Sequence, residues 1–210
     1  MAPESAPLTA HLGAMDILAL YRLRGGLAYE GEGVTQLQHG WQCARLARLA
    51  GATPALQLAS WLHDLGHLMT GWEGSPTVRG LDDAHETLAA KVLAPLFGPA
   101  VGEPVALHVA AKRCLVGSQP GYRETLSPDS VRSLALQGGP MSPSECEDFL
   151  ARPHARESLR LRVWDDRAKD PALHPPGAEA ALEELAMLMG RVQADSALPA
   201  GTTQAETASP

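Results

Sequence analysis

The sequence has 210 residues, and its 17 Lys and Arg against 24 Asp and Glu give a formal net charge of −7. This length suits one domain with a buried core, and 45% hydrophobic residues are too many for a disordered protein. The acidic balance without a basic block argues against a nucleic-acid partner, and no apolar stretch is long enough to cross a membrane.

Helical periodicity of the apolar residues predicts an all-α fold. Aromatic residues make up only 4%, and Ala and Leu dominate the apolar content, which favours helices over strands. Thr35 with Gln38 and Asp83 with Glu86 are expected to form capping boxes. The predicted helices cover about 12–24, 35–50, 54–66, 83–97, 101–115, 128–138, 143–151, 156–169 and 177–193.

One domain at 12–193 is expected between two irregular ends. Residues 1–11 are rich in Pro, Ala and Ser and predict a flexible N-terminus, and 194–210 lack a periodic apolar face and predict a disordered tail. The three cysteines form no CxxC pair, and the first fifteen residues contain no Lys or Arg. We therefore expect no disulfide framework, no secretory signal and a cytoplasmic location.

Five histidines lie on the core-facing sides of four predicted helices. Any one of them alone is most simply a core residue with a local partner. Five together are harder to explain in this way, because a buried imidazole without a partner is costly. Neutral imidazole is the commonest metal ligand, so a shared metal centre is the economical interpretation. The five are His39, His63, His67, His85 and His108.

The dipeptide His63-Asp64 strengthens the metal interpretation. Adjacent helical residues diverge by about 100°, so both side chains can reach an ion beside the end of the helix. Such a dipeptide alone is a weak signal. With His39 upstream and His85 and His108 downstream it becomes a strong one.

A second carboxylate is expected from Asp165, on the helix side shared with Arg162. Asp166 lies further round and is interpreted as solvated, in an ion pair with Lys169. Four His and two Asp form a nitrogen and oxygen ligand set that suits iron, manganese or zinc. Six ligands are too many for one catalytic ion with an open position, so we predict two ions that share Asp64.

Cationic and hydroxyl groups are expected beside this centre. Lys112 follows His108 on the same helical stripe, where its amine needs an anionic partner unless it extends to the surface. Arg162 faces the same region, and Ser130 and Ser133 lie near a helix N-terminus. Together these groups are typical of a phosphate or phosphonate site. For the serines, ordinary capping or surface placement is an equal alternative.

The loop YEGEG at 29–33 precedes the helix that carries His39. Its glycines would allow it to act as a lid, with Tyr29 reaching a metal and Glu32 receiving a cation. From the residues alone, a simple turn with exposed acidic groups is the more economical interpretation.

The pattern His39, His63-Asp64 and Asp165 resembles the HD-domain superfamily, and the additional His85 and His108 resemble its dinuclear members. A narrower resemblance, over about 15–190, is to the mixed-valent diiron oxygenases that cleave organophosphonates, typified by 2-amino-1-hydroxyethylphosphonate dioxygenase. The segments that carry it are 29–39, 108–113, 126–141 and 164–170. The resemblance implies an HD-domain helical bundle that encloses a dinuclear metal site.

The resemblance also implies roles for individual residues. Two iron ions, Fe(II) and Fe(III), would be held by His39, His63, Asp64 and Asp165 on one side and by Asp64, His85 and His108 on the other. Tyr29 would gate the site, Glu32 would take the substrate ammonium, and His67 would act beside them as a further catalytic candidate. The phosphonate would contact His67, Lys112, Ser130, Ser133 and Arg162, with Gln38 in the pocket wall. Of Glu30 and Glu32, the second is preferred for its distance from His39.

The implied activity uses O2 as co-substrate to cleave the C–P bond of a small organophosphonate, best matched by conversion of (R)-2-amino-1-hydroxyethylphosphonate to glycine and phosphate. The alternative is a metal-dependent HD phosphohydrolase acting on a phosphomonoester or nucleotide, which would need neither O2 nor the residues Tyr29 and Glu32. A non-catalytic metal-dependent binding domain is a further alternative, against which the anion-binding groups argue. The residues leave open the substituent on the substrate nitrogen and the oligomeric state.

Overall fold

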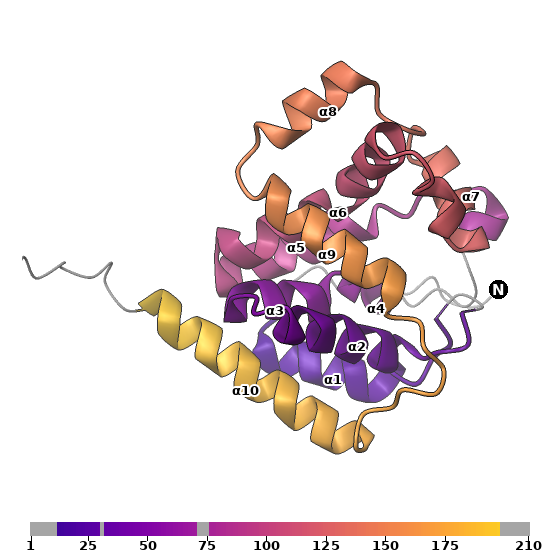
Figure 1. Ribbon diagram of the computed structural model, residues 1–210. Coiled ribbons are helices and arrows are strands. Elements are labelled where there is room, and N and C mark those ends of the chain that lie inside the picture. The colour runs from indigo at the N-terminus through magenta and orange to yellow at the C-terminus, as the bar shows by residue number, and fades with distance from the viewer. Residues whose placement is uncertain (1–11, 30–31, 71–75, 198–210) are drawn as a thin grey trace, which may run out of the picture.

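The computed structural model describes residues 12–29, 32–70 and 76–197, and in these ranges all regular elements are helical (Figure 1). One isolated antiparallel bridge joins Ala28 to Thr35 at the two sides of the loop. The all-α prediction is therefore confirmed. The expected flexible N-terminus, Glu30 and most of the expected tail lie outside the described residues.

The helices follow the predicted segments closely, with two differences. The last helix continues to Ala197, inside the segment expected to be irregular, and the predicted helix at 54–66 is divided in two. Short 3-10 helices occupy Thr77–Arg79 and Arg123–Thr125. The ten α-helices within the described ranges are α1 (Ala14–Arg24), α2 (Gln36–Leu49), α3 (Pro54–Leu62), α4 (Leu65–Thr70), α5 (His85–Phe97), α6 (Pro99–Ser118), α7 (Pro128–Leu136), α8 (Pro143–Leu150), α9 (Ala155–Arg167) and α10 (Ala178–Ala197).

The start of α2 has the predicted capping box. The Thr35 hydroxyl accepts a hydrogen bond from the Gln38 backbone N–H at 3.2 Å, and the Thr35 N–H donates to Gln38 Oε1 at 3.4 Å. The second predicted box, Asp83 with Glu86, is wrong. Helix α5 starts after Ala84, which has a left-handed φ of 48°, and the Asp83 carboxylate turns instead toward two imidazoles.

The break between α3 and α4 falls at His63 and Asp64. Gly66, just beyond it, packs so tightly against the backbone of His85 that an added Cβ would overlap the His85 carbonyl oxygen. This close approach, which only glycine permits, places the break beside the first turn of α5. The polar dipeptide therefore faces the interior where two helices meet.

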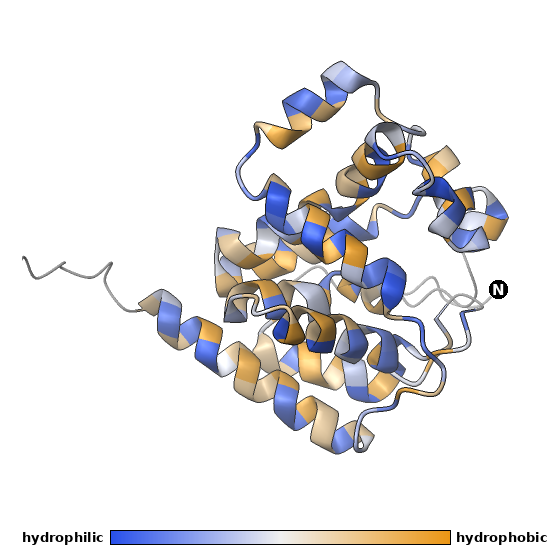
Figure 2. Cartoon of the chain, in the orientation of Figure 1, coloured by the Kyte–Doolittle hydropathy of each residue, from blue (hydrophilic) through white to orange (hydrophobic). Residues whose placement is uncertain are grey.

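The main apolar core lies between α1, α2, α3, α4, α5, α9 and α10, with the first turns of α6. Leu58, Leu93, Leu161 and Leu185 are fully buried there, and each contributes about 1.5–3 kcal/mol of burial free energy. Helix α6 packs on α5, α9 and α3, and a smaller apolar cluster joins it to α8. Hydrophobic and hydrophilic residues alternate around these helices (Figure 2). None of the described helices is both long and apolar enough to cross a membrane.

Candidate metal centre

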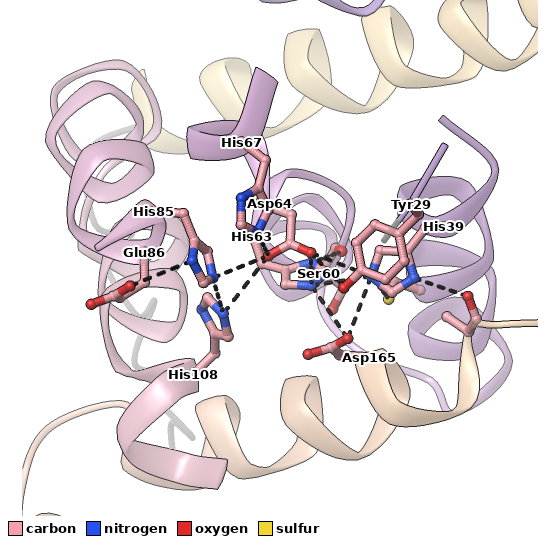
Figure 3. Close-up of polar contacts among 12 residues, drawn as sticks. Tyr29, His39, Ser60, His63, Asp64, His67, His85, Glu86, His108 and Asp165 are labelled. Carbon is pink, nitrogen blue, oxygen red and sulfur yellow. Dashed lines mark hydrogen bonds and ion pairs between the residues drawn. The ribbon is translucent and has the colours of Figure 1, made fainter. Parts of the chain in front are cut away.

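Four imidazoles and two carboxylates converge inside the helical bundle (Figure 3). Each of these side chains belongs to a residue that is at most 8% exposed, a costly placement for polar groups without partners. The structure thus brings together all six predicted ligands. Helix α2 carries His39, the α3–α4 break carries His63 and Asp64, and α5, α6 and α9 carry His85, His108 and Asp165.

Each of the four imidazoles turns its Nδ1 toward a fixed acceptor. A carbonyl or carboxylate oxygen can only accept, so a neutral ring carries its proton on Nδ1 and leaves Nε2 as a bare acceptor. The acceptors are the Ala168 carbonyl for His39 at 2.9 Å, the Ser60 carbonyl for His63 at 2.9 Å, the Val105 carbonyl for His108 at 2.8 Å and Asp83 Oδ1 for His85 at 2.9 Å.

The four Nε2 atoms face one another in two pairs. Nε2 of His39 lies 3.3 Å from Nε2 of His63, and Nε2 of His85 lies 3.1 Å from Nε2 of His108. Two bare lone pairs at such distances repel. Each pair therefore needs a cation, which can be a proton or a metal ion.

The Asp64 carboxylate lies between the two pairs and faces both (Figure 3). Its Oδ2 is 3.3 Å from His63 Nε2 and 3.6 Å from His39 Nε2, and its Oδ1 is 3.4 Å from His85 Nε2 and 3.9 Å from His108 Nε2. One carboxylate whose two oxygens each face a pair of imidazole nitrogens has the arrangement that a bridging ligand requires.

Asp165 supplies one oxygen that has no hydrogen-bond partner among the described residues. Its Oδ1 is buried, 3.4 Å from His39 Nε2 and 3.7 Å from His63 Nε2, while Oδ2 lies 2.6 Å from Arg162. Burial alone would raise the pKa of Asp165, but Arg162 and His63 outweigh it and hold this pKa well below its usual value. An ionised oxygen without a donor, beside two imidazole nitrogens, fits a metal ligand.

The charge balance around His63, Asp64 and Asp165 also calls for a bound cation. Burial lowers the pKa of His63, but the carboxylates of Asp64 and Asp165 outweigh that effect and raise it to about 10. In contrast, burial and the neighbouring His85 hold the pKa of His108 well below its usual value, so that ring is neutral. In the absence of metal, the site therefore takes up a proton at His63.

A cavity of about 50 Å³ opens onto the centre. Its wall contains predicted metal ligands, the predicted gating residue Tyr29 and five of the seven predicted substrate contacts. These five are His67, Lys112, Ser130, Ser133 and Arg162. Gln38 and Glu32 do not line this cavity. The Gln38 amide instead donates to the Leu173 carbonyl at 2.9 Å.

Two buried cations stand on the cavity wall. Lys112 is 2% exposed, and its Nζ donates to the Ser133 hydroxyl at 2.6 Å. Burial lowers the pKa of Lys112 to about 7, and the nearby charge of Arg162 acts in the same direction. Arg162 also reaches the Ser130 hydroxyl at 3.4 Å. The predicted convergence of cations and hydroxyls is thus present.

Tyr29 covers the centre from the loop side. Its hydroxyl donates to Asp64 Oδ2 at 2.9 Å, and its ring stacks on that of His39 with centroids 3.9 Å apart. Burial raises the pKa of Tyr29 well above its usual value, and Asp64 raises it further. The phenol therefore stays protonated and keeps its hydrogen bond.

Asp83 was missed as a site residue. One of its oxygens lies 2.8 Å from His67 Nδ1 and the other 2.9 Å from His85 Nδ1. The carboxylate therefore links a predicted substrate contact to a predicted metal ligand. Its position before a predicted helix suggested a capping residue, which concealed this role.

Two further residues lie near the centre, and one of them, Asp166, differs from expectation. Cys43 Sγ lies 3.9 Å from His39 Nε2, but burial raises the pKa of this thiol and Asp165 raises it further, so it stays protonated and provides no thiolate. Asp166 is not solvated as predicted. Its side chain is 8% exposed, pairs with Arg162 and accepts a hydrogen bond from the Tyr122 hydroxyl.

No protein-family profile matches the chain, but individual curated proteins do. A hydroxymethylphosphonate dioxygenase from Gimesia maris is 43% identical over 152 residues, which cover 72% of this chain and 76% of the relative. A [1-hydroxy-2-(trimethylamino)ethyl]phosphonate dioxygenase (glycine-betaine-forming) from Leisingera caerulea is 33% identical over 157 residues, or 75% of this chain and 80% of the relative. This chain belongs to the phosphonate dioxygenase family.

The same family likeness extends to an uncharacterised protein of Acanthamoeba polyphaga mimivirus, 35% identical over 155 residues, or 73% of this chain and 71% of that protein. The predicted resemblance to oxygenases of organophosphonates is confirmed by the two named relatives. The protein is therefore an enzyme of the phosphonate dioxygenase type, and its buried His and Asp cluster is compatible with a metal site.

Proposed function

We propose that this phosphonate dioxygenase uses O2 and two iron ions to cleave the C–P bond of a small 1-hydroxyphosphonate, releasing phosphate and a carboxylic acid. The observation that carries the proposal is the pair of facing imidazole sets around Asp64, beside a cavity with buried cations. A mixed-valent Fe(II)/Fe(III) pair, when bound, would supply the redox chemistry that a C–P bond needs, because this bond offers no good leaving group for hydrolysis.

The proposed ligands divide according to the two imidazole pairs. Asp64 belongs to both sets, because each of its oxygens faces one pair. Nitrogen and oxygen ligands without thiolate suit iron. One ion would be held by His39, His63, Asp64 and Asp165, and the other by Asp64, His85 and His108.

The phosphonate group would bind at the cationic wall of the cavity. Among the described residues, no carboxylate lies within ion-pair distance of Lys112, although its amine is buried. A phosphonate oxygen beside this amine would supply the missing anion and favour the charged form of the lysine. Arg162, Ser130, Ser133 and His67 lie around the same space and would orient the remaining oxygens.

Tyr29 would control access to the centre. Its ring and hydroxyl cover Asp64 and His39, so a substrate that reaches the centre from this side has to displace it.

We also propose a reducing, cytoplasmic setting, because the three cysteines are buried and free. We propose no nucleic-acid partner, because the formal net charge is −7 and the sequence contains no basic block.

The decisive experiment measures O2 uptake and phosphate release by iron-loaded, partly oxidised protein with a set of 1-hydroxyphosphonates. We expect phosphate to appear only in the presence of O2 and two irons to be bound per chain. Phosphate release that continues under anaerobic conditions would instead identify a metal-dependent phosphohydrolase.

A matched pair of lysine variants tests the phosphonate contact. Lys112→Met removes the buried cation, whereas Lys91→Met removes an exposed one on α5. We expect Lys112→Met to raise KM by about 10- to 100-fold, because a charge-assisted contact in a closed site is lost, with an unchanged iron content. An equal KM for the two variants would contradict the assignment.

A further inference from the structure

Glu32, the residue predicted to receive a substrate ammonium, is already paired with a cation of the chain itself. Its Oε1 lies 3.2 Å from Nζ of Lys169, and the two side chains are only 15% and 13% exposed. A carboxylate that is mostly withdrawn from water and neutralised by an ammonium group has little charge left to offer a ligand.

Lys169 is held in this position by further contacts. Its Nζ lies 3.3 Å from the Ser127 hydroxyl and 5.6 Å from the centre of the Tyr29 ring, a distance suited to a cation–π contact. Ser127 caps α7, which presents Ser130 and Ser133 to the cavity. The ammonium group of Lys169 thus connects the loop, the end of α9 and the start of α7 at the edge of the site.

Glu32 and Lys169 do not line the cavity but lie beside its Tyr29 wall, where Lys169 Nζ is 5.6 Å from the ring centre. A substrate ammonium that reaches Glu32 past Tyr29 would compete with Lys169 for that carboxylate. Its binding would leave the Lys169 amine mostly buried without its carboxylate, or would place two cations beside one carboxylate, and both arrangements are unfavourable. A substrate without an amine leaves the pair of Glu32 and Lys169 intact.

We propose that Lys169 is a specificity-determining residue that holds Glu32 in an internal ion pair and so withholds this carboxylate from a substrate ammonium. The enzyme would then prefer a 1-hydroxyphosphonate without an amine, such as hydroxymethylphosphonate. This inference rests on the proposed function and replaces the aminated substrate expected from the resemblance. It assigns Glu32 to an internal ion pair.

The test compares two ligands, hydroxymethylphosphonate and 2-amino-1-hydroxyethylphosphonate, by anaerobic equilibrium binding to iron-loaded protein and by kcat/KM in air. The variants are Lys169→Met, which removes the charge at similar length, and Lys169→Arg, which keeps it. We expect wild type and Lys169→Arg to favour the amine-free ligand by at least about tenfold, and Lys169→Met to shift the ratio toward the aminated ligand by about tenfold.

The double variant Lys169→Met with Glu32→Gln separates this effect from a change in folding. We expect it to lose the gain for the aminated ligand, because Glu32 is the group that Lys169→Met sets free. A wild-type preference for the aminated ligand, or an unchanged ratio in Lys169→Met, would overturn the role of Lys169. If wild type releases no O2-dependent phosphate from either compound, the proposed function itself fails, and the inference with it.

Discussion

At the scale of single residues, the candidate centre is defined by the direction of each imidazole. The Nδ1 contacts of the four predicted histidine ligands fix which nitrogen faces inward. Such contacts outside the ligand set fix the tautomer and orientation of each imidazole and raise its basicity toward a metal.

Asp83 provides the most accessible test of this orientation. In Asp83→Asn an amide N–H can face the Nδ1–H of His67 or His85, and one hydrogen bond is lost. We expect iron affinity to fall by about 10- to 100-fold, with the loss confined to one of the two ions. Iron content measured against Asp82→Asn, an exposed neighbouring change, checks this. Equal iron content in the two variants would show that Asp83 does not orient His85.

The proton on His63 predicts how metal binding depends on pH. Without metal, His63 has a pKa of about 10 and is protonated at neutral pH, so binding has to release this proton. Affinity should therefore rise with pH, by about tenfold per unit below pH 10 for one released proton. Chelator competition between pH 6.5 and 8 measures the slope. A pH-independent affinity would mean that His63 is not a ligand.

At the scale of elements, the break between α3 and α4 decides where the ligands stand. The sequence predicted one helix through 54–66, because apolar periodicity continues across the break, and α4 is too short to show a period of its own. Asp83 was misread because an acidic residue three positions before a glutamate has the pattern of a capping box. No local sequence pattern indicates the ion pair between Lys169 and Glu32, since the two residues are far apart in the chain.

Gly66 is expected to be essential for the position of this break. In Gly66→Ala the added Cβ overlaps the His85 carbonyl oxygen, so α4 and α5 have to move apart. We expect destabilisation of about 1–3 kcal/mol together with loss of iron. Gly190→Ala on α10 is the control, because a Cβ there meets no atom of the described residues within 4 Å, and it should be neutral or stabilising. Thermal denaturation and iron content measure both changes, and similar behaviour of the two variants would contradict the prediction.

At the scale of the whole molecule, the centre depends on the complete fold. Its six predicted ligands come from five parts of the chain, spread from His39 to Asp165. Helix periodicity and the grouping of histidines were sufficient to predict the fold class and these six residues. The ion pair of Lys169 with Glu32 could not be predicted, because it joins residues 137 positions apart in the chain. The pair of Arg162 with Asp166 is an i,i+4 pair within α9, whereas the predicted partner of Asp166 was Lys169.

Because the ligand set exists only in the folded chain, metal should stabilise the protein as a whole. At a free iron concentration about 100 times Kd, binding adds about 2.7 kcal/mol, and Tm should rise by about 5–11 °C for a chain of this size. Scanning calorimetry with and without a chelator measures the shift. An unchanged Tm would show that the centre does not hold metal in the folded state.

Three of the four imidazole anchors are carbonyl oxygens of the main chain. A carbonyl is common to all amino acids, so replacing Ser60, Val105 or Ala168 by another residue leaves that acceptor in place. Of the four histidines, only His85 has a side-chain acceptor, the carboxylate of Asp83, which a substitution can remove. A single substitution at Asp83 can therefore change the orientation and basicity of His85, in the half of the centre that contains α5. The orientations of His39 and His63, in the half that contains α2, do not depend on the identity of the residues that supply their acceptors.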